Sequence, residues 1–226
     1  AYICTLNNTF IIFFLICVLL KKVVKYFVIR GVIMLNLNNC FFHFVGGYQI
    51  LDTTKSIEKL KSILNNGYIL SREKQKLLLN TDYSNNGRNW NGEKYISICK
   101  IGKCNDEYED DEENAYDTFC YTSATCIILD HNALYKRRKN YWHMQGEIQV
   151  EDTINSNSFK GIGIQFNSYF DLILNGIPDK RKLELLKSDI ELFEKIQKIA
   201  KQYPIYSLNN GELASDYLKK EKQIIK

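Results

Sequence analysis

Three short patterns, spread along the chain, combine residue types that bind a small molecule and act on it. Each pattern lies where the apolar residues predict a strand, so each side chain would be held on a rigid element. The patterns are His43 in the aromatic run FFHF, Tyr95 and Ser97 in YISIC, and Gln145 and Glu147 in QGEIQV.

These residue types suit proton transfer and charge stabilisation in a bound substrate. A carboxylate such as Glu147 stabilises positive charge or removes a proton. Gln145 lies two residues before Glu147, so its side chain would project to the same face. A neutral imidazole such as that of His43 both donates and accepts hydrogen bonds. Tyr95 could stack on a planar ring, and Ser97 could hydrogen-bond Glu147.

The elements that must position these residues follow from hydrophobic periodicity and turn residues. Strands that alternate with few helices, rather than one helix after each strand, predict an α+β fold. The sequence predicts strands at 41–44, 68–71, 95–99, 147–150, 161–166 and 205–206, with one or two more within 119–129. It predicts helices from Asp52 or Thr53 to Asn66, at 180–202 and at 212–225, with further helical turns at 73–79.

The order of these patterns resembles the ADP-ribosyltransferase fold over most of residues 40–207. That resemblance implies split antiparallel sheets around an NAD cleft, with one early helix and C-terminal helices. It implies that NAD is a substrate, that His43, Tyr95 and Ser97 bind it, and that Glu147 and Gln145 act in catalysis. The four side chains of His43, Tyr95, Ser97 and Glu147 are then expected to face one cleft.

The resemblance also implies a biological setting. The chain would be an NAD-dependent ADP-ribosyltransferase that modifies a protein or a nucleic acid, in a bacterial toxin or phage-defence role. An antitoxin or immunity protein would be its partner. The alternative is a non-catalytic interaction or nucleic-acid-binding domain, including a degenerate relative of the same fold. In that case His43 is a core residue and Glu147 an exposed carboxylate at the start of a strand. If the chain is an enzyme, Glu151 or Glu93 could be the important acid instead of Glu147.

A dense basic cluster lies apart from these patterns. It comprises Lys136, Arg137, Arg138 and Lys139, with two tyrosines and a tryptophan beside it. Basic groups with flanking aromatic rings suit nucleic acid, since they combine phosphate contact with base stacking. The simpler reading is a solvated loop that pairs with the acidic run at 105–114.

Composition excludes several classes of protein. With 226 residues, 45% hydrophobic and 25% charged, the chain suits one globular domain, or one domain with an appendage. It contains no P-loop, no G-x-G-x-x-G and no H-E-x-x-H. Its seven cysteines form no C-x-x-C pair, which predicts reduced thiols in a cytoplasmic protein and no metal site.

The first thirty-three residues differ from the rest. Thr9–Leu20 is an apolar run of twelve followed by lysines, short of the roughly 20 residues that cross a bilayer. Residues 1–33 are interpreted as a translated leader upstream of a start at Met34, or as a membrane anchor. The working domain is then 34–226.

A chain that begins at Met34 is therefore expected to fold cooperatively without detergent, as measured by thermal unfolding. If it aggregates while the full chain is stable in detergent, the leader interpretation fails and the anchor interpretation gains.

Overall fold

The structure is a computed structural model. It describes residues 34–45, 53–79, 94–101, 116, 123–134, 138–139, 147–167 and 179–224. Contacts divide the chain into two units, Ala1–Met34 and Leu35–Lys226, and every described residue except Met34 belongs to the second. The predicted leader therefore lies outside the described residues. Within the described part of the chain, no helix is both long and apolar enough to cross a membrane.

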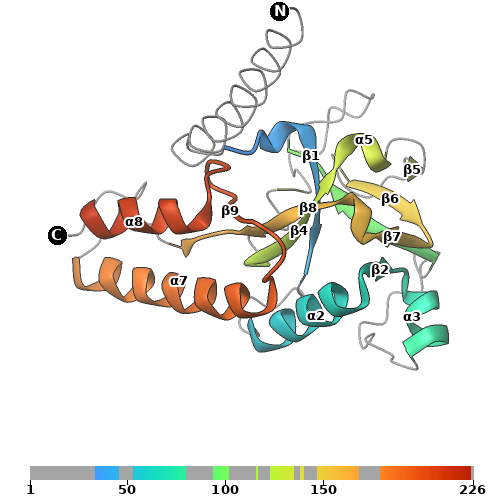
Figure 1. Ribbon diagram of the computed structural model, residues 1–226, viewed down its shortest axis with the longest axis horizontal. Helices are drawn as coiled ribbons and strands as arrows, with labels where there is room; N and C mark the ends of the chain where they lie inside the picture. The colour runs from blue at the N-terminus through green and yellow to red at the C-terminus, as the bar shows by residue number, and fades with distance from the viewer. Residues whose placement is uncertain are drawn as a thin grey trace, which may run out of the picture. The chain divides into compact units, whose positions relative to one another are not determined.

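The described part of the second unit mixes helices and strands, and β3 and β4, like β5, β6 and β7, follow one another without a described helix between them (Figure 1). The helices are α2 Thr53–Asn66, α3 Arg72–Leu79, α5 His131–Leu134, α7 Asp179–Ile199 and α8 Ala214–Ile224, with 3₁₀ turns at Leu37–Asn39 and Ser156–Ser158. The strands are β1 Cys40–Phe44, β2 Tyr68–Leu70, β3 Tyr95–Cys99, β4 Thr125–Asp130, β5 Arg138–Lys139, β6 Glu147–Glu151, β7 Thr153–Asn155, β8 Phe159–Ile164 and β9 Ile205–Ser207.

The strands form two sheets, which confirms the α+β class. The larger sheet has seven strands in the order β5-β6-β3-β1-β4-β8-β9, and β2 pairs with β7 in a separate two-stranded sheet. The pairs are antiparallel except for β8 and β9, which run parallel. The parallel pair has a physical reason: α7 lies between the two strands in sequence, and a long crossover of this kind joins parallel neighbours.

The seven-stranded sheet splits between β1 and β3. On one side β1 pairs with β4 at five successive positions, from Cys40–Asp130 to Phe44–Cys126. On the other side it pairs with β3 at one position, Phe42–Cys99. Paired strands stay at hydrogen-bonding distance. Because β1 and β3 pair at a single position, they separate beyond Phe42.

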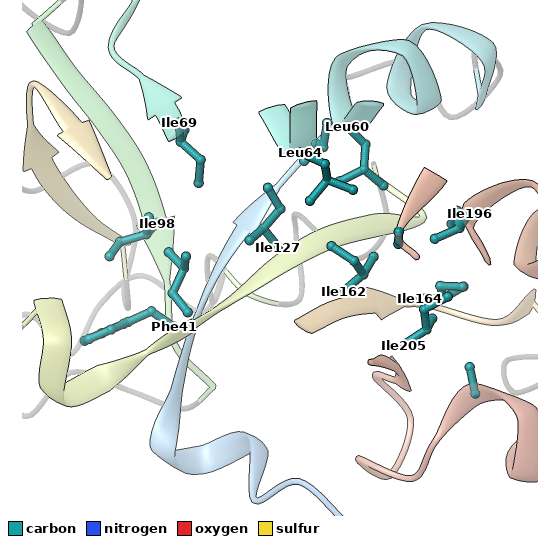
Figure 2. Close-up of a cluster of buried hydrophobic side chains, with 14 of the residues drawn as sticks. Phe41, Leu60, Leu64, Ile69, Ile98, Ile127, Ile162, Ile164, Ile196 and Ile205 are labelled. Carbon is teal, nitrogen blue, oxygen red and sulfur yellow. The ribbon is translucent and has the colours of Figure 1, made fainter. Parts of the chain in front are cut away.

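Successive side chains of each strand point to opposite faces of the sheet. One face carries the larger apolar cluster, which includes Phe41, Ile98, Ile127, Ile162 and Ile164. In Figure 2, Leu60 and Leu64 extend from α2 into this cluster. Helices α7 and α8 contact each other and complete the cover of this face (Figure 1). The other face carries a smaller cluster around Phe42, Cys99 and Tyr206.

Two glycines with positive φ fix turns that the fold needs. Gly67 (φ 73°) ends α2, and Gly211 (φ 77°) accepts a hydrogen bond from Leu35 N–H onto its carbonyl at 2.8 Å. A Cβ on Gly211 would overlap the Leu35 carbonyl oxygen, whereas a Cβ on Gly67 would meet Ser156 Oγ at an ordinary 3.5 Å.

The pair makes a matched stability test. Gly67→Ala is expected to lower the free energy of unfolding by about 1–2 kcal/mol, which is the cost of a left-handed alanine. Gly211→Ala is expected to lower it by about 1–3 kcal/mol more, because the methyl group also overlaps backbone. Denaturant unfolding of both variants measures the difference. Equal losses would contradict the close approach of Leu35.

Candidate functional site

Ser97 and Glu147 lie on one face of the β3–β6 pair. Cα partners in an antiparallel pair share a face, and the partners here are Tyr95–Glu151, Ser97–Gln149 and Cys99–Glu147. Ser97 Oγ donates to Glu147 Oε1 at 2.5 Å, across the diagonal of this register. The Ser97 hydroxyl, which strand β3 holds in place, therefore orients one carboxylate oxygen of Glu147.

His43 lies on β1, across the split, and forms a hydrogen bond with the backbone of β3. Its Nδ1 lies 2.9 Å from the carbonyl oxygen of Ser97. A carbonyl oxygen only accepts, so Nδ1 carries the proton, and the neutral ring has its lone pair on Nε2. One residue thus connects the other two: the backbone of Ser97 accepts from His43, and its side chain donates to Glu147.

The chain of hydrogen bonds crosses the sheet. Along β1, His43 alternates with Phe42 and is the Cα partner of Ile127, so its side chain starts from the face of the larger apolar cluster. Cys99 pairs with Phe42, and Ser97 and Glu147 share the face of Cys99. The His43 ring reaches the backbone of β3 where the two strands separate, and Glu147 lies beyond it on the opposite face.

A cavity of about 210 Å³ lies on the His43 side of the split. The end of β1 and residues of α2, β2 and α3 surround it. Its lining is part polar and part apolar: His43, Phe44, Val45, Lys59, Ser62, Ile63, Asn66, Tyr68, Ile69, Leu70 and Gln75.

The surroundings of His43 keep its ring neutral. Burial lowers the pKa of His43 below its usual value, the hydrogen bond with Ser97 opposes that effect, and the Lys59 ammonium lowers the pKa further. Near neutral pH the imidazole is therefore uncharged and offers Nε2 as an acceptor.

Hydrogen bonds thus connect three of the predicted site residues: His43, Ser97 and Glu147. Tyr95 lies two residues from Ser97 on the same face, where it pairs with Glu151. The expectation that four side chains face one cleft is wrong. His43 starts from one face of the sheet and lines the cavity, whereas Tyr95, Ser97 and Glu147 start from the opposite face, as the Phe42–Cys99 register requires. Gln145 lies outside the described residues.

The structure describes two of the four residues of the predicted basic cluster. Lys136 and Arg137 lie outside the described residues. The backbone of Arg138 and Lys139 forms the edge strand β5, with Lys139 as the Cα partner of Gln149. This places the strand next to the one that carries Glu147.

Sequence reasoning missed the α2 and β2 side of the cavity. Lys59, Ser62, Ile63 and Asn66 recur at i, i+3, i+4 and i+7, which places them along one stripe of α2. That spacing is visible in the sequence, but three of the four residues are polar and read there as a solvated helix face. Only the position of β1 beside α2 makes the stripe part of a site.

The described part of the chain holds no group of three or more histidine, cysteine or acidic residues placed to bind a metal ion. Cys40, Cys99 and Cys126 are buried and form no disulfide.

Comparison with known proteins gives a distant structural likeness. No family model and no curated protein matches the sequence. The structure is similar to that of Thermus sp. 2.9 DarT in complex with carba-NAD+, with 10% sequence identity and a TM-score of 0.36. The same protein in complex with NAD+ gives 9% identity and a TM-score of 0.35. Both alignments cover 75% of this chain and 95% of the DarT chain.

The lowered pKa of His43 predicts a pH dependence of stability. Above about pH 6.5 the ring is neutral in the folded and the unfolded chain, so the full stability is present. As pH falls below that value, the unfolded chain binds a proton that the folded chain resists, so stability is lost. His43→Gln should therefore show a smaller loss of melting temperature between pH 7.5 and 5 than the wild type. Parallel pH profiles of the two proteins would contradict the neutral ring.

Proposed function

We propose that this chain is an NAD-dependent ADP-ribosyltransferase that uses Glu147 as its catalytic carboxylate. The observation that carries the proposal is the hydrogen-bonded chain from His43 through Ser97 to Glu147, across strands that are adjacent in the sheet although the sequence separates them widely. The family resemblance requires a histidine strand, a Tyr-x-Ser strand and a glutamate strand that act together, and the strand order β6-β3-β1 supports that grouping.

Glu147 has the setting that the chemistry needs. The reaction breaks the bond between nicotinamide and ribose, so that positive charge develops on the sugar carbon and an acceptor attacks it. A carboxylate held by Ser97 Oγ is oriented before the substrate arrives, which lowers the cost of stabilising that charge. The same carboxylate can take the proton that the acceptor loses as it attacks.

His43 and the split suit the rest of the substrate. A dinucleotide is longer than one pocket, and the residues of this site lie on both faces of the sheet where β1 and β3 separate. The lone pair on His43 Nε2 can accept from a ribose hydroxyl. We further propose that Tyr95 stacks on the nicotinamide ring and that Gln145 orients the acceptor. The acceptor is a protein or a nucleic acid in this proposal, within a toxin or defence role.

Two matched substitutions on one strand test the proposal. Glu147→Gln keeps the shape of the side chain and removes the charge, so nicotinamide release from NAD should fall about 10²–10⁴-fold. Glu151→Gln makes the same change four residues further along β6, on the same face, and should leave most of the activity. Nicotinamide release is measured by chromatography after incubation with NAD, with melting temperatures as the check on folding.

Two results would count against the assignment. Loss of activity in Glu151→Gln with activity kept in Glu147→Gln would move the catalytic role to Glu151. No nicotinamide release from the folded wild-type protein, with or without cell lysate as a source of acceptor, would favour the non-catalytic alternative.

A further inference from the structure

Asp152 joins the two sheets of the fold. It is the single residue between β6, which belongs to the seven-stranded sheet, and β7, which pairs with β2 in the two-stranded sheet. Its φ is 75°, and in the described part of the chain it is the one residue other than glycine with a positive φ. A left-handed backbone lowers the population of an L residue roughly five- to thirtyfold. The contacts around Asp152 must therefore hold it in this conformation.

Hydrogen bonds from the backbone of Asp152 reach the ends of strands in both sheets. Its N–H donates to the carbonyl oxygen of Lys94 at 3.1 Å, one residue before β3. Its own carbonyl oxygen accepts from Ser71 N–H at 2.9 Å, one residue after β2. Ser71 is buried, and its Oγ accepts from the backbone N–H of Lys74 at 3.4 Å, in the first turn of α3. One residue thus connects the start of β3 with the end of β2 and the start of α3.

An ion pair holds the side chain of Asp152. Lys74 Nζ lies 3.1 Å from Asp152 Oδ2, and it donates to Thr153 Oγ1 at 3.4 Å. The side chains of Asp152 and Lys74 are 60% and 34% exposed, so solvent screens their attraction. Such a pair shifts an equilibrium by about fivefold at most, and salt weakens it further. The ion pair therefore offsets part of the backbone strain at Asp152 but not all of it.

The two-stranded sheet has little pairing of its own. It consists of three residue pairs, and two strands alone are marginally stable in water. The middle pair, Ile69 and Ile154, is buried in the larger apolar cluster and resists opening. The pair next to Asp152 is Leu70 and Thr153. Because every residue of β2 lines the cavity, an opening that starts at Asp152 changes the wall of the cavity.

We propose that Asp152 and Lys74 form a salt-sensitive latch between the two sheets. In the closed state the ion pair and the two backbone hydrogen bonds keep Asp152 left-handed. When the ion pair breaks, the backbone of Asp152 relaxes to a negative φ and the hydrogen bond from Ser71 N–H is lost. The β2 wall of the cavity then opens at Leu70. This inference does not depend on the catalytic role proposed for Glu147.

Amide hydrogen exchange of the full chain, followed residue by residue by NMR, tests the latch. The Ser71 amide reports on the closed state, because it donates to Asp152. Two amides serve as references: Ser156 N–H is hydrogen-bonded at the other end of the two-stranded sheet, and Ile162 N–H is hydrogen-bonded on β8. Lys74→Gln should raise the exchange rate of Ser71 about two- to fivefold and leave both references unchanged.

High salt should have the same effect on the wild type. The Debye length falls to about 3 Å at 1 M ionic strength, so the attraction between Lys74 and Asp152 is then largely screened. The exchange rate of Ser71 relative to the reference amides should therefore rise with salt in the wild type and stay constant in Lys74→Gln.

Three further variants separate the latch from a general effect on stability. Lys219→Gln removes another exposed ion pair, with Asp216 on α8, and should leave Ser71 exchange unchanged. Asp152→Gly and Asp152→Ala both remove the carboxylate, but glycine adopts a positive φ without strain. Ser71 should therefore exchange about five- to thirtyfold faster in the alanine variant than in the glycine variant.

Four results would overturn the inference. They are unchanged Ser71 exchange in folded Lys74→Gln, equal increases at Ser71 and the two reference amides, an effect of Lys219→Gln as large as that of Lys74→Gln, and equal Ser71 exchange in the two Asp152 variants. Melting temperatures identify a variant that fails to fold. The wild type in high salt then decides, because Ser71 exchange that does not rise relative to the references also contradicts the latch.

Discussion

The hydrogen bond from His43 Nδ1 to the Ser97 carbonyl oxygen spans the place where backbone pairing between β1 and β3 stops. The two strands pair at Phe42–Cys99, and beyond Phe42 β1 stays with β4 while β3 stays with β6. An opened sheet leaves backbone carbonyls without their usual partners, and burying such a group costs about 1–3 kcal/mol. The imidazole satisfies one of these carbonyls and still leaves room for the split. Both the cavity and the orientation of Glu147 depend on this arrangement.

Much of the fold could be predicted because the long elements carry periodic apolar patterns. The expected strand at 95–99 has the same bounds as β3, and the expected helices correspond to α2, α7 and α8 within a few residues. What could not be predicted depends on long-range pairing. Strand β7 has three residues, too few for a period of two to show, and exists because it pairs with β2. Strand β5 lies in a segment that reads as a basic connector, and it forms through pairing with β6.

For the site, the residues could be predicted, but not the faces of the sheet on which they lie. Residue types and family order pointed to His43, Ser97 and Glu147, and the structure connects these three. The sequence could not show on which face each side chain lies, since that depends on the Phe42–Cys99 register rather than on any local pattern. The place of Lys59 in the cavity lining could not be predicted for another reason. A lysine on a helix surface is ordinary until a strand end packs beside it, and the neighbour here lies sixteen residues earlier in the sequence.

The electrostatic effect of Lys59 on His43 explains why a titratable residue suits position 43. A permanently charged arginine beside Lys59 would place two positive charges in one partly enclosed site, where like charges repel more strongly than in water. Histidine avoids that repulsion by giving up its proton, and the Ser97 carbonyl determines which ring nitrogen keeps the one that remains. The protonation of His43 and the bond that spans the split are therefore coupled, although Glu147 lies on the opposite face of the sheet.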